Sequence, residues 1–437
     1  MEDIQYYCLK RRTKFIQELP DYSLAIIPNK ARELRSNDVE HKFKPNSDFY
    51  YLTGVEEPDS ICIIKKEKRH AVYILFVEER NKEKEIWVGK TIGTEGAKKT
   101  YKAHVAYKRD EFLNKLNSFM KGVEYIYYPF GININLDPKI TNIFQELRQL
   151  NRAGIKPPKA IYDPREIIHK LRLIKDPFEI KLMTEAAEIT KEAHILTMSF
   201  AKSGIAEHEL EASIEYKFRS AGALGPSYPS IVGSGNNSTI LHYTRNNKTI
   251  QKNDLILIDA GCEYKYYASD VTRTFPANKK FTSAQKDIYE IVLEAQLKGI
   301  EEVKPGKRFI DSYNKAVSII VDGLKELKLL KGSKQEIIKK GKYKKFFMHR
   351  LGHWLGLDVH DAGPYVDRNG HSIKLQPNMV MTVEPGIYIH PNSDSVPKAF
   401  RGIGIRIEDD VLITKNGNKV LTEGIPKLIE DIESLAS

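Results

Sequence analysis

Two aspartates stand at the edges of two β-rich runs in the stretch DLILIDAGCEYKYYASDVTRTFP, at 254–276. The run at 255–258 is apolar on both faces up to Asp259, and the run at 271–275 follows Asp270. We expect two strands joined by a turn containing Gly261, with the two carboxylates close together. Burying a carboxylate without a partner costs several kcal/mol, so this pattern favours a cation site. A pair of aspartates capping a hairpin explains this stretch equally well.

The composition indicates a globular protein with two domains. The chain has 437 residues, of which 41% are hydrophobic and 29% charged. No apolar run approaches the ~20 residues that would span a bilayer, so we expect no membrane association. The N-terminus has no apolar segment typical of a secretory signal, and Cys8, Cys62 and Cys262 form no CxxC motif. These features favour the cytoplasm.

The net charge of +11 does not indicate a nucleic-acid partner. A nucleic-acid-binding protein concentrates its basic residues on one element. Here the lysines are scattered and interrupted by acids, as in EERNKEKE at 78–85. We interpret them as a solvated surface.

Residues 1–173 read as one α/β domain. Helical patterns at 9–19 and 111–120 alternate with β-rich runs at 23–27, 48–55, 60–66, 70–77 and 123–130. Trp87 is one of only two tryptophans and stands in a polar stretch of this domain. It is either a residue of the domain core or part of a subunit interface.

Residues 174–437 form the second domain, in which one pattern occurs twice. Asp176 and Glu179 predict a capped helix that runs to about residue 202, followed by a helix at 206–220. Thr282 and Gln285 predict another capped helix to about residue 303, followed by a helix at 309–327. Both units continue into strands and are offset by 102 residues, the spacing from Gly204 to Gly306. This organisation predicts a pseudo-symmetric domain with a site between its halves.

Three later segments add further candidate metal ligands. His353 lies in the segment FFMHRLGHWLGLDVHD. Glu384 ends a β-rich run in the segment MVMTVEPGIYI. In GIGIRIEDDVLIT, we expect Glu408 to share one strand face with Gly404 and Arg406, while the pair Asp409-Asp410 is typical of a turn. The candidate ligands are then Asp259, Asp270, His353, Glu384 and Glu408.

Four carboxylates around one imidazole indicate two divalent ions, because one ion would leave too much negative charge uncompensated. Such ligands suit manganese, iron(II), cobalt or zinc, and the excess of carboxylates favours manganese. Each residue taken alone has an ordinary structural explanation. Their combined order and positions near strands favour the metal site.

The chain resembles the aminopeptidase P family of metallopeptidases, which have the pita-bread fold. The motifs that carry the resemblance are NSDFYYLTG, SYPSIVGSG, LHYT, IDAGCEY, DVTRTFP, HWLGLDVHD, TVEPGIY and GIGIRIEDD, in this order along nearly the whole chain. The resemblance implies an α/β (α+β) protein with an N-terminal domain and a pita-bread catalytic domain. It also implies removal of the N-terminal residue from peptides with proline second, by attack of a metal-bridging hydroxide.

The resemblance also assigns roles to individual residues. Asp270 and Glu408 would bridge the two ions, Asp259 would also meet the substrate's α-amine, and Glu384 would shuttle a proton. Two histidines, His242 and His360, would contact the substrate around the scissile bond. The residues that would line or brace the pocket are Tyr228, His349, Tyr388 and Arg406. Members with this extra domain commonly form homodimers or homotetramers.

One residue departs from the family pattern: Arg350 follows His349 where the family usually has glycine. Its side chain either alters the pocket wall or points to solvent. The alternative enzyme is prolidase, which has the same fold and metals but cleaves only dipeptides. The alternative class is a metal-free binding protein of this fold, although all five ligands are present here.

Overall fold

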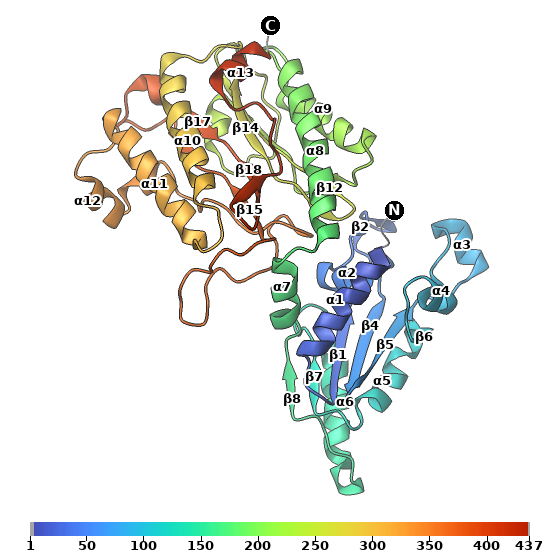
Figure 1. The fold of residues 1–437 in the computed structure, drawn as a ribbon. Coiled ribbons are helices and arrows are strands. Elements are labelled where there is room, and N and C mark those ends of the chain that lie inside the picture. Colours follow the sequence, from blue (N-terminus) through green and yellow to red (C-terminus); the bar gives the residue numbers. More distant parts are fainter. Residues whose placement is uncertain (1–3, 436–437) are drawn as a thin grey trace. The chain divides into compact units, whose positions relative to one another are not determined.

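The computed structural model describes residues 4–435, and the chain divides into two compact units, residues 1–172 and 173–437 (Figure 1). Each unit has its own hydrophobic core. Among the described residues, no helix is long and apolar enough to cross a membrane.

The first unit is built on one mixed six-stranded sheet with the order β6-β5-β4-β1-β7-β8. β1 pairs with β4, and β4 with β5, in antiparallel fashion, whereas the outer strands pair in parallel. The strands are β1 (Ser23–Pro28), β4 (Ile61–Glu67), β5 (His70–Val77), β6 (Val105–Lys108), β7 (Tyr125–Tyr127) and β8 (Ala160–Tyr162).

Helices cover this sheet because its strands carry apolar side chains on both faces. α5 (Phe112–Met120) and α6 (Asp137–Gln149) pack on one face, where the ring of Phe112 meets that of Phe76 edge-on at 5.2 Å. α1 (Ile4–Glu18) supplies Arg12, whose guanidinium lies 4.0 Å from the centre of the Tyr73 ring. The smaller elements are β2 (Leu34–Ser36), β3 (Val39–Glu40), α4 (Gly93–Lys99) and α7 (Arg165–Leu173).

The predicted strand at 48–55 is wrong, because this segment forms the helix α2 (Ser47–Thr53). Asn46 caps it by accepting from the backbone N–H groups of Asp48 and Phe49, at 3.1 and 3.0 Å. Gly54 ends it in the left-handed conformation, with φ +67°. The helix is buried over most of its surface, so its apolar run lacks the helical period that would have distinguished it from a strand.

The interpretation of Trp87 as a core residue is also wrong. Trp87 lies on the short helix α3 (Lys82–Val88) and is 87% exposed. Its neighbours Ile86 and Val88 are 83% and 55% exposed. This apolar tip of α3 has no buried residue.

The second unit contains two helix pairs that match the predicted repeat. α8 (Pro177–Phe200) packs against α9 (Glu207–Ser220), and α10 (Ser283–Glu301) against α11 (Phe309–Glu326). Asp176 and Thr282 cap the first helix of each pair, as predicted, by accepting from the third backbone N–H. Figure 1 shows both pairs on the outside of strands that run through the unit. Two short helices, α12 (Lys334–Lys339) and α13 (Ile429–Ser434), complete it.

The strands of the second unit form short antiparallel sheets. One contains β10 (Ile231–Ser234), β11 (Leu255–Asp259) and β14 (Thr272–Pro276), and its counterpart contains β15 (Val380–Val383), β18 (Asp409–Ile413) and β19 (Asn418–Val420). The others are β9 (Gly225–Pro226) with β12 (Cys262–Tyr264) and β13 (Tyr267–Ala268), and β16 (Gly386–Tyr388) with β17 (Gly404–Arg406).

Three local expectations need correction. Between β11 and β14 the chain forms the extra hairpin β12–β13, so no simple turn at Gly261 joins the aspartate strands. Gly261 instead permits a close approach, because a Cβ there would lie 1.8 Å from the carbonyl oxygen of Ser269. Glu408 lies in the two-residue break between β17 and β18 rather than within one strand. Asp409 and Asp410 begin the buried strand β18 and form no turn.

Candidate metal centre and active site

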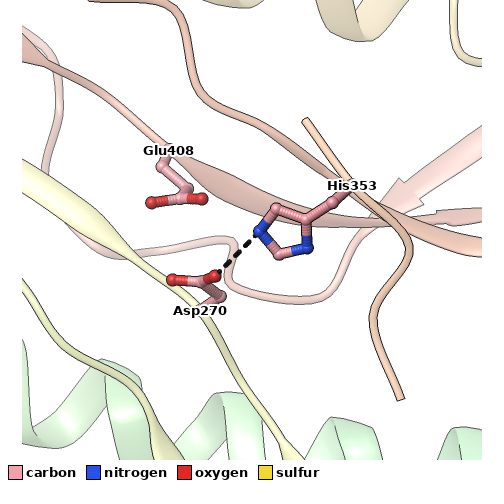
Figure 2. A group of neighbouring side chains, drawn as sticks. All are labelled: Asp270, His353 and Glu408. Atoms are coloured by element: carbon pink, nitrogen blue, oxygen red, sulfur yellow. Dashed lines mark ion pairs between the residues drawn. The ribbon is translucent and has the colours of Figure 1, made fainter. Parts of the chain in front are cut away.

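Three predicted ligands from distant parts of the chain meet at the centre of the second unit. Asp270, His353 and Glu408 each offer a ligand atom, and these atoms all lie within 4.8 Å of one another (Figure 2). His353 Nε2 lies 3.2 Å from Asp270 Oδ2. His353 Nδ1 lies 3.0 Å from the carbonyl oxygen of Trp354, which can only accept a hydrogen bond. This contact holds a proton on Nδ1, so Nε2 is the ring atom that would bind a metal ion.

The other two predicted ligands border this group. Glu384 Oε1 lies 3.7 Å from His353 Nε2. The hydroxyl of Tyr228 lies 2.7 Å from Asp259 Oδ1 and 2.5 Å from Asp270 Oδ1, so it links these two carboxylates. The five side chains therefore surround one space, although Asp259 also forms an ion pair with Arg406.

A cavity of about 600 Å³ opens beside the five carboxylate and imidazole groups. Of the residues predicted for the site, all except Tyr388 line it. Tyr388 is 3% exposed and lies behind the wall. The lining residues from the predicted set are Tyr228, His242, Asp259, Asp270, His349, His353, His360, Glu384, Arg406 and Glu408.

The site contains more carboxylates than neighbouring cations can neutralise. Burial, together with Asp270 and Glu384, raises the pKa of Glu408 well above its usual range. Burial raises the pKa of Glu384 to about 7 against the opposing effect of His353. The pKa of Asp259 is also raised by burial, although Arg406 opposes the shift. Oxygen ligands with one imidazole suit divalent cations, whose charge would relieve this crowding, so the donor set fits a metal centre.

The histidines of the cavity have different environments. Burial lowers the pKa of His349 to about 4, and the charge of Arg406 adds to this. Partial burial of the ring, followed by the charge of the neighbouring His353, also lowers the pKa of His360. The rings of His353 and His360 meet edge-on with centres 4.4 Å apart. Both His242 and His360 are exposed residues of loops, where a substrate can reach them.

A chain of hydrogen bonds holds the cavity wall. Arg406 Nη1 donates to the Tyr388 hydroxyl at 2.9 Å, and that hydroxyl lies 3.0 Å from His349 Nε2. Arg406 Nε donates to Thr272 Oγ1 at 3.0 Å, and Thr272 donates in turn to Glu408 at 2.6 Å. Arg406 thus connects the wall of the cavity to the metal-ligand group. Thr272 was missed in the sequence, although it lies only two residues after Asp270 and begins β14.

A second set of missed residues supports the ligands from behind. Asp410 accepts from the backbone N–H of Asp270 at 3.2 Å. Arg273 is completely buried and donates to the carbonyl oxygen of Glu408 at 2.6 Å and to Asp409 Oδ1 at 2.7 Å. The available signal was the start of an apolar, β-rich run directly at Asp409-Asp410, since acids at a buried strand need partners.

The loop that carries His242 is held by Glu207, which the sequence analysis also missed. Glu207 is completely buried and accepts from the hydroxyl of Tyr243 at 2.8 Å and from the backbone N–H of Lys248 at 2.9 Å. Its other oxygen accepts from the backbone N–H of Ser234 at 2.7 Å. The position of Glu207 near a helix start resembles ordinary capping, so no sequence signal distinguished it.

Comparison with known proteins places this site in a described family. Residues 181–415 match the model of metallopeptidase family M24, and residues 8–127 match that of the aminopeptidase P N-terminal domain. An Xaa-Pro aminopeptidase of Escherichia coli K12 is 41% identical over 427 residues, covering 98% of this chain and 96% of that protein. Human Xaa-Pro aminopeptidase 3 is 36% identical, covering 95% of this chain and 81% of that protein.

Solved structures agree with these sequence matches. A Pseudomonas aeruginosa aminopeptidase has a TM-score of 0.97 and 43% identity, covering 100% of this chain and 98% of that chain. Zinc-substituted E. coli aminopeptidase P in complex with product has a TM-score of 0.95 and 40% identity, covering 99% of this chain and 98% of that one. The expected fold class, an N-terminal α/β domain followed by a catalytic domain of this family, is confirmed.

Proposed function

This chain belongs to metallopeptidase family M24, and on that premise we propose that it is an Xaa-Pro aminopeptidase. It releases the N-terminal residue from peptides that have proline in second place. The observation that carries this proposal is the meeting of Asp270, His353 and Glu408, with ligand atoms within 4.8 Å of one another, beside a peptide-sized cavity. The domain limits that we propose are 1–173 and 174–437.

The metal centre is proposed to hold two divalent ions, of which manganese is the preferred candidate. Asp270 and Glu408 would contact both ions, and Asp259, His353 and Glu384 would complete the set. Divalent ions in such a site act as Lewis acids and lower the pKa of a coordinated water. Carboxylates outnumber the imidazole four to one among these five residues, which favours manganese over softer ions.

The chain's own residues bind and orient the peptide. Asp259 accepts a charge-assisted hydrogen bond from the free α-amine of the substrate. His242 and His360, which reach the cavity from loops, donate to the carbonyl oxygen of the first peptide bond. Glu384 has its Oε1 facing His353 and its Oε2 facing His349, at 3.7 and 3.8 Å, and it moves the proton to the leaving nitrogen.

Two features would select proline in second place: the flat rings of the pocket wall, and the absence of an N–H on the proline nitrogen. His242, His349, His360 and Tyr228 line the cavity with flat rings that suit a pyrrolidine ring, and Tyr388 supports His349 from behind. An ordinary residue in second place would bring an N–H that has no evident acceptor and would fill the space poorly. Loss of roughly 2–3 kcal/mol of transition-state binding, or about a hundredfold in rate, would follow.

We further propose that the enzyme acts in the cytoplasm as a homodimer or homotetramer and has no nucleic-acid or membrane partner. The three cysteines are buried free thiols, as is usual in a reducing compartment. The exposed apolar tip of α3, formed by Ile86, Trp87 and Val88, is a suitable contact for a second copy.

The deciding experiment is hydrolysis of Xaa-Pro-Yaa tripeptides by the dialysed protein, before and after chelation and after return of Mn²⁺. We expect release of the first residue, its loss with chelator and its recovery with the ion. N-acetylation of the peptide should abolish cleavage because the amine contact is removed. Equal kcat/KM values for Arg-Pro-Pro and Arg-Ala-Ala would contradict the proline requirement. Cleavage restricted to Xaa-Pro dipeptides would indicate prolidase instead.

A further inference from the structure

One exposed cation, Arg350, lines the cavity. The other guanidinium in the lining belongs to Arg406, which is buried and paired with Asp259. Arg350 forms no ion pair with any carboxylate of residues 4–435. We propose that Arg350 binds a carboxylate of the substrate on the leaving-group side of the scissile bond. This inference rests on the proposed peptidase function and defines which peptides it prefers.

The backbone of Arg350 lies beside the acidic residues of the cavity. Its carbonyl oxygen lies 2.7 Å from His349 Nδ1, which itself lies 3.8 Å from Glu384 Oε2. The Arg350 side chain extends from there to an exposed position, with its guanidinium 5.5 Å from the centre of the Tyr365 ring. An aromatic face at this range attracts a guanidinium and limits its directions. Arg350 is therefore partly oriented before any ligand arrives.

The charges of the cavity are arranged from one end to the other. Its four carboxylates are those of Asp259, Asp270 and Glu408, which are buried, and of Glu384, which is partly buried; they form the floor, whereas the exposed Arg350 supplies positive charge on the solvent side, the mouth. A short peptide carries the opposite pattern, with its ammonium group at one end and its carboxylate at the other. A tripeptide spans about 10 Å when extended. With the amine on the acidic floor, the carboxylate of a short peptide points towards the mouth.

The guanidinium chemistry selects a carboxylate in particular. Its planar fork can donate two parallel hydrogen bonds to one carboxylate, which neither an amide nor a hydroxyl can accept equally well. Two sources supply this group after the proline: the C-terminal carboxylate of a tripeptide, or the side chain of an acidic third residue. Both lie beyond the scissile bond, so the contact exists before and during the reaction. We therefore expect Arg350 to lower KM while leaving kcat nearly unchanged.

The test compares four peptides: Ala-Pro-Ala and Ala-Pro-Ala-amide, which differ in the C-terminal charge, and Ala-Pro-Glu-amide and Ala-Pro-Gln-amide, which differ in the side-chain charge. Steady-state kinetics are measured for the metal-loaded wild type, Arg350→Gln, Arg350→Lys and Lys344→Gln. Lys344 is exposed and does not line the cavity, so its variant matches the change in net charge.

We expect the wild type and Lys344→Gln to prefer the charged peptide of at least one pair by about three- to tenfold in kcat/KM, the range of an ion pair at a cavity edge. The preference should disappear in Arg350→Gln, fall partly in Arg350→Lys and shrink in 0.5 M NaCl. The pair that responds identifies the source of the carboxylate. If the ratio of kcat/KM between charged and uncharged peptides is the same in the wild type and Arg350→Gln, and both cleave Ala-Pro-Ala-amide, the role of Arg350 is overturned. The proposed peptidase function would then still stand. Failure of the wild type to cleave any of the four would overturn the proposed function and this inference together.

Discussion

The ammonium group of Lys175 donates a 2.8 Å hydrogen bond to Oδ2 of Asp361, and the two side chains are 0% and 1% exposed. Asp361 directly follows His360, and its backbone N–H donates to the carbonyl oxygen of Trp354 at 2.9 Å. The backbone N–H of Lys175 donates to Asn378. This buried ion pair therefore fixes one end of the loop that presents His360 to the cavity.

Lys175→Met should lower the free energy of unfolding by about 3–5 kcal/mol, because it removes the buried ammonium group that donates to the Asp361 carboxylate. Turnover should fall as well, since the His360 loop loses its anchor. Urea unfolding and steady-state kinetics measure the two effects. Lys298→Met, which breaks the exposed pair with Glu301, should leave the free energy of unfolding nearly unchanged. If adding Asp361→Asn to Lys175→Met restored no stability, the ion pair would not be the cause.

Asp270→Ala and Glu408→Ala should each lose activity together with the stoichiometry of two ions per chain. A carboxylate that contacts both ions cannot be removed without affecting both. Metal content after dialysis, determined by atomic emission, checks this. Asp394→Ala removes a carboxylate that is 95% exposed and should change neither quantity. A full metal complement with normal turnover in either ligand variant would refute the assignment.

His360→Ala should retain its metal but lose turnover by about 10²–10⁴-fold, as is usual for a positioned acid–base or electrophilic group. His360 lines the cavity and contacts the ring of His353 without belonging to the proposed ligand set. Metal content and kcat measured on the same preparation separate the two roles. A parallel fall in both would make His360 a ligand.

His194 should make the stability depend on pH between about 6.5 and 4. It is fully buried in α8, and its Nε2 lies 2.8 Å from the carbonyl oxygen of Ala260. Burial lowers its pKa from 6.5 to about 4. In this window the unfolded chain binds the proton better than the folded one, so the stability is complete above pH 6.5 and falls as the pH decreases. The loss attributable to this residue approaches about 3 kcal/mol near pH 4.

The measurement for His194 is the difference in unfolding free energy between the wild type and His194→Gln. Other titrating groups act on both proteins, so the difference isolates this imidazole. We expect the advantage of the wild type to shrink by about 2–3 kcal/mol from pH 7.5 to pH 4.5. A difference that is constant over this range would contradict a neutral buried His194.

Trp87→Ser should weaken self-association, because Trp87 is 87% exposed in the apolar tip of α3. Burying such an indole in a subunit contact is worth several kcal/mol, so its loss shifts the assembly towards monomers. Light scattering at micromolar concentration measures the mass. The matched control is Tyr216→Ser, which removes a 70% exposed aromatic ring from α9. A wild-type mass near the 50.1 kDa of one chain would contradict the assembly.

Local signals in the sequence were sufficient for the long helices, and motifs brought out ten of the residues that line the cavity. Asp176 with Glu179, and Thr282 with Gln285, predicted two helix starts because a capping side chain bonds to a backbone N–H only three residues away. Tyr388 was also predicted from its motif but lies behind the cavity wall. By contrast, the buried run at 48–55 was assigned to a strand. A helix that is apolar on most sides shows no hydrophobic periodicity that distinguishes it from a strand.

The tertiary structure alone decided how these residues are held. Asp410 supports Asp270 across 140 positions of sequence, and Lys175 holds Asp361 across 186. It also decided that Trp87 is exposed and that Arg350 lines the cavity without an ion pair to any carboxylate of the described residues. A motif is a local pattern, whereas the partner of a buried charge depends on which distant strand or loop packs against it. For this protein the sequence determined the helix starts and the chemistry available at the site, and long-range packing determined the partners and exposure of each charge.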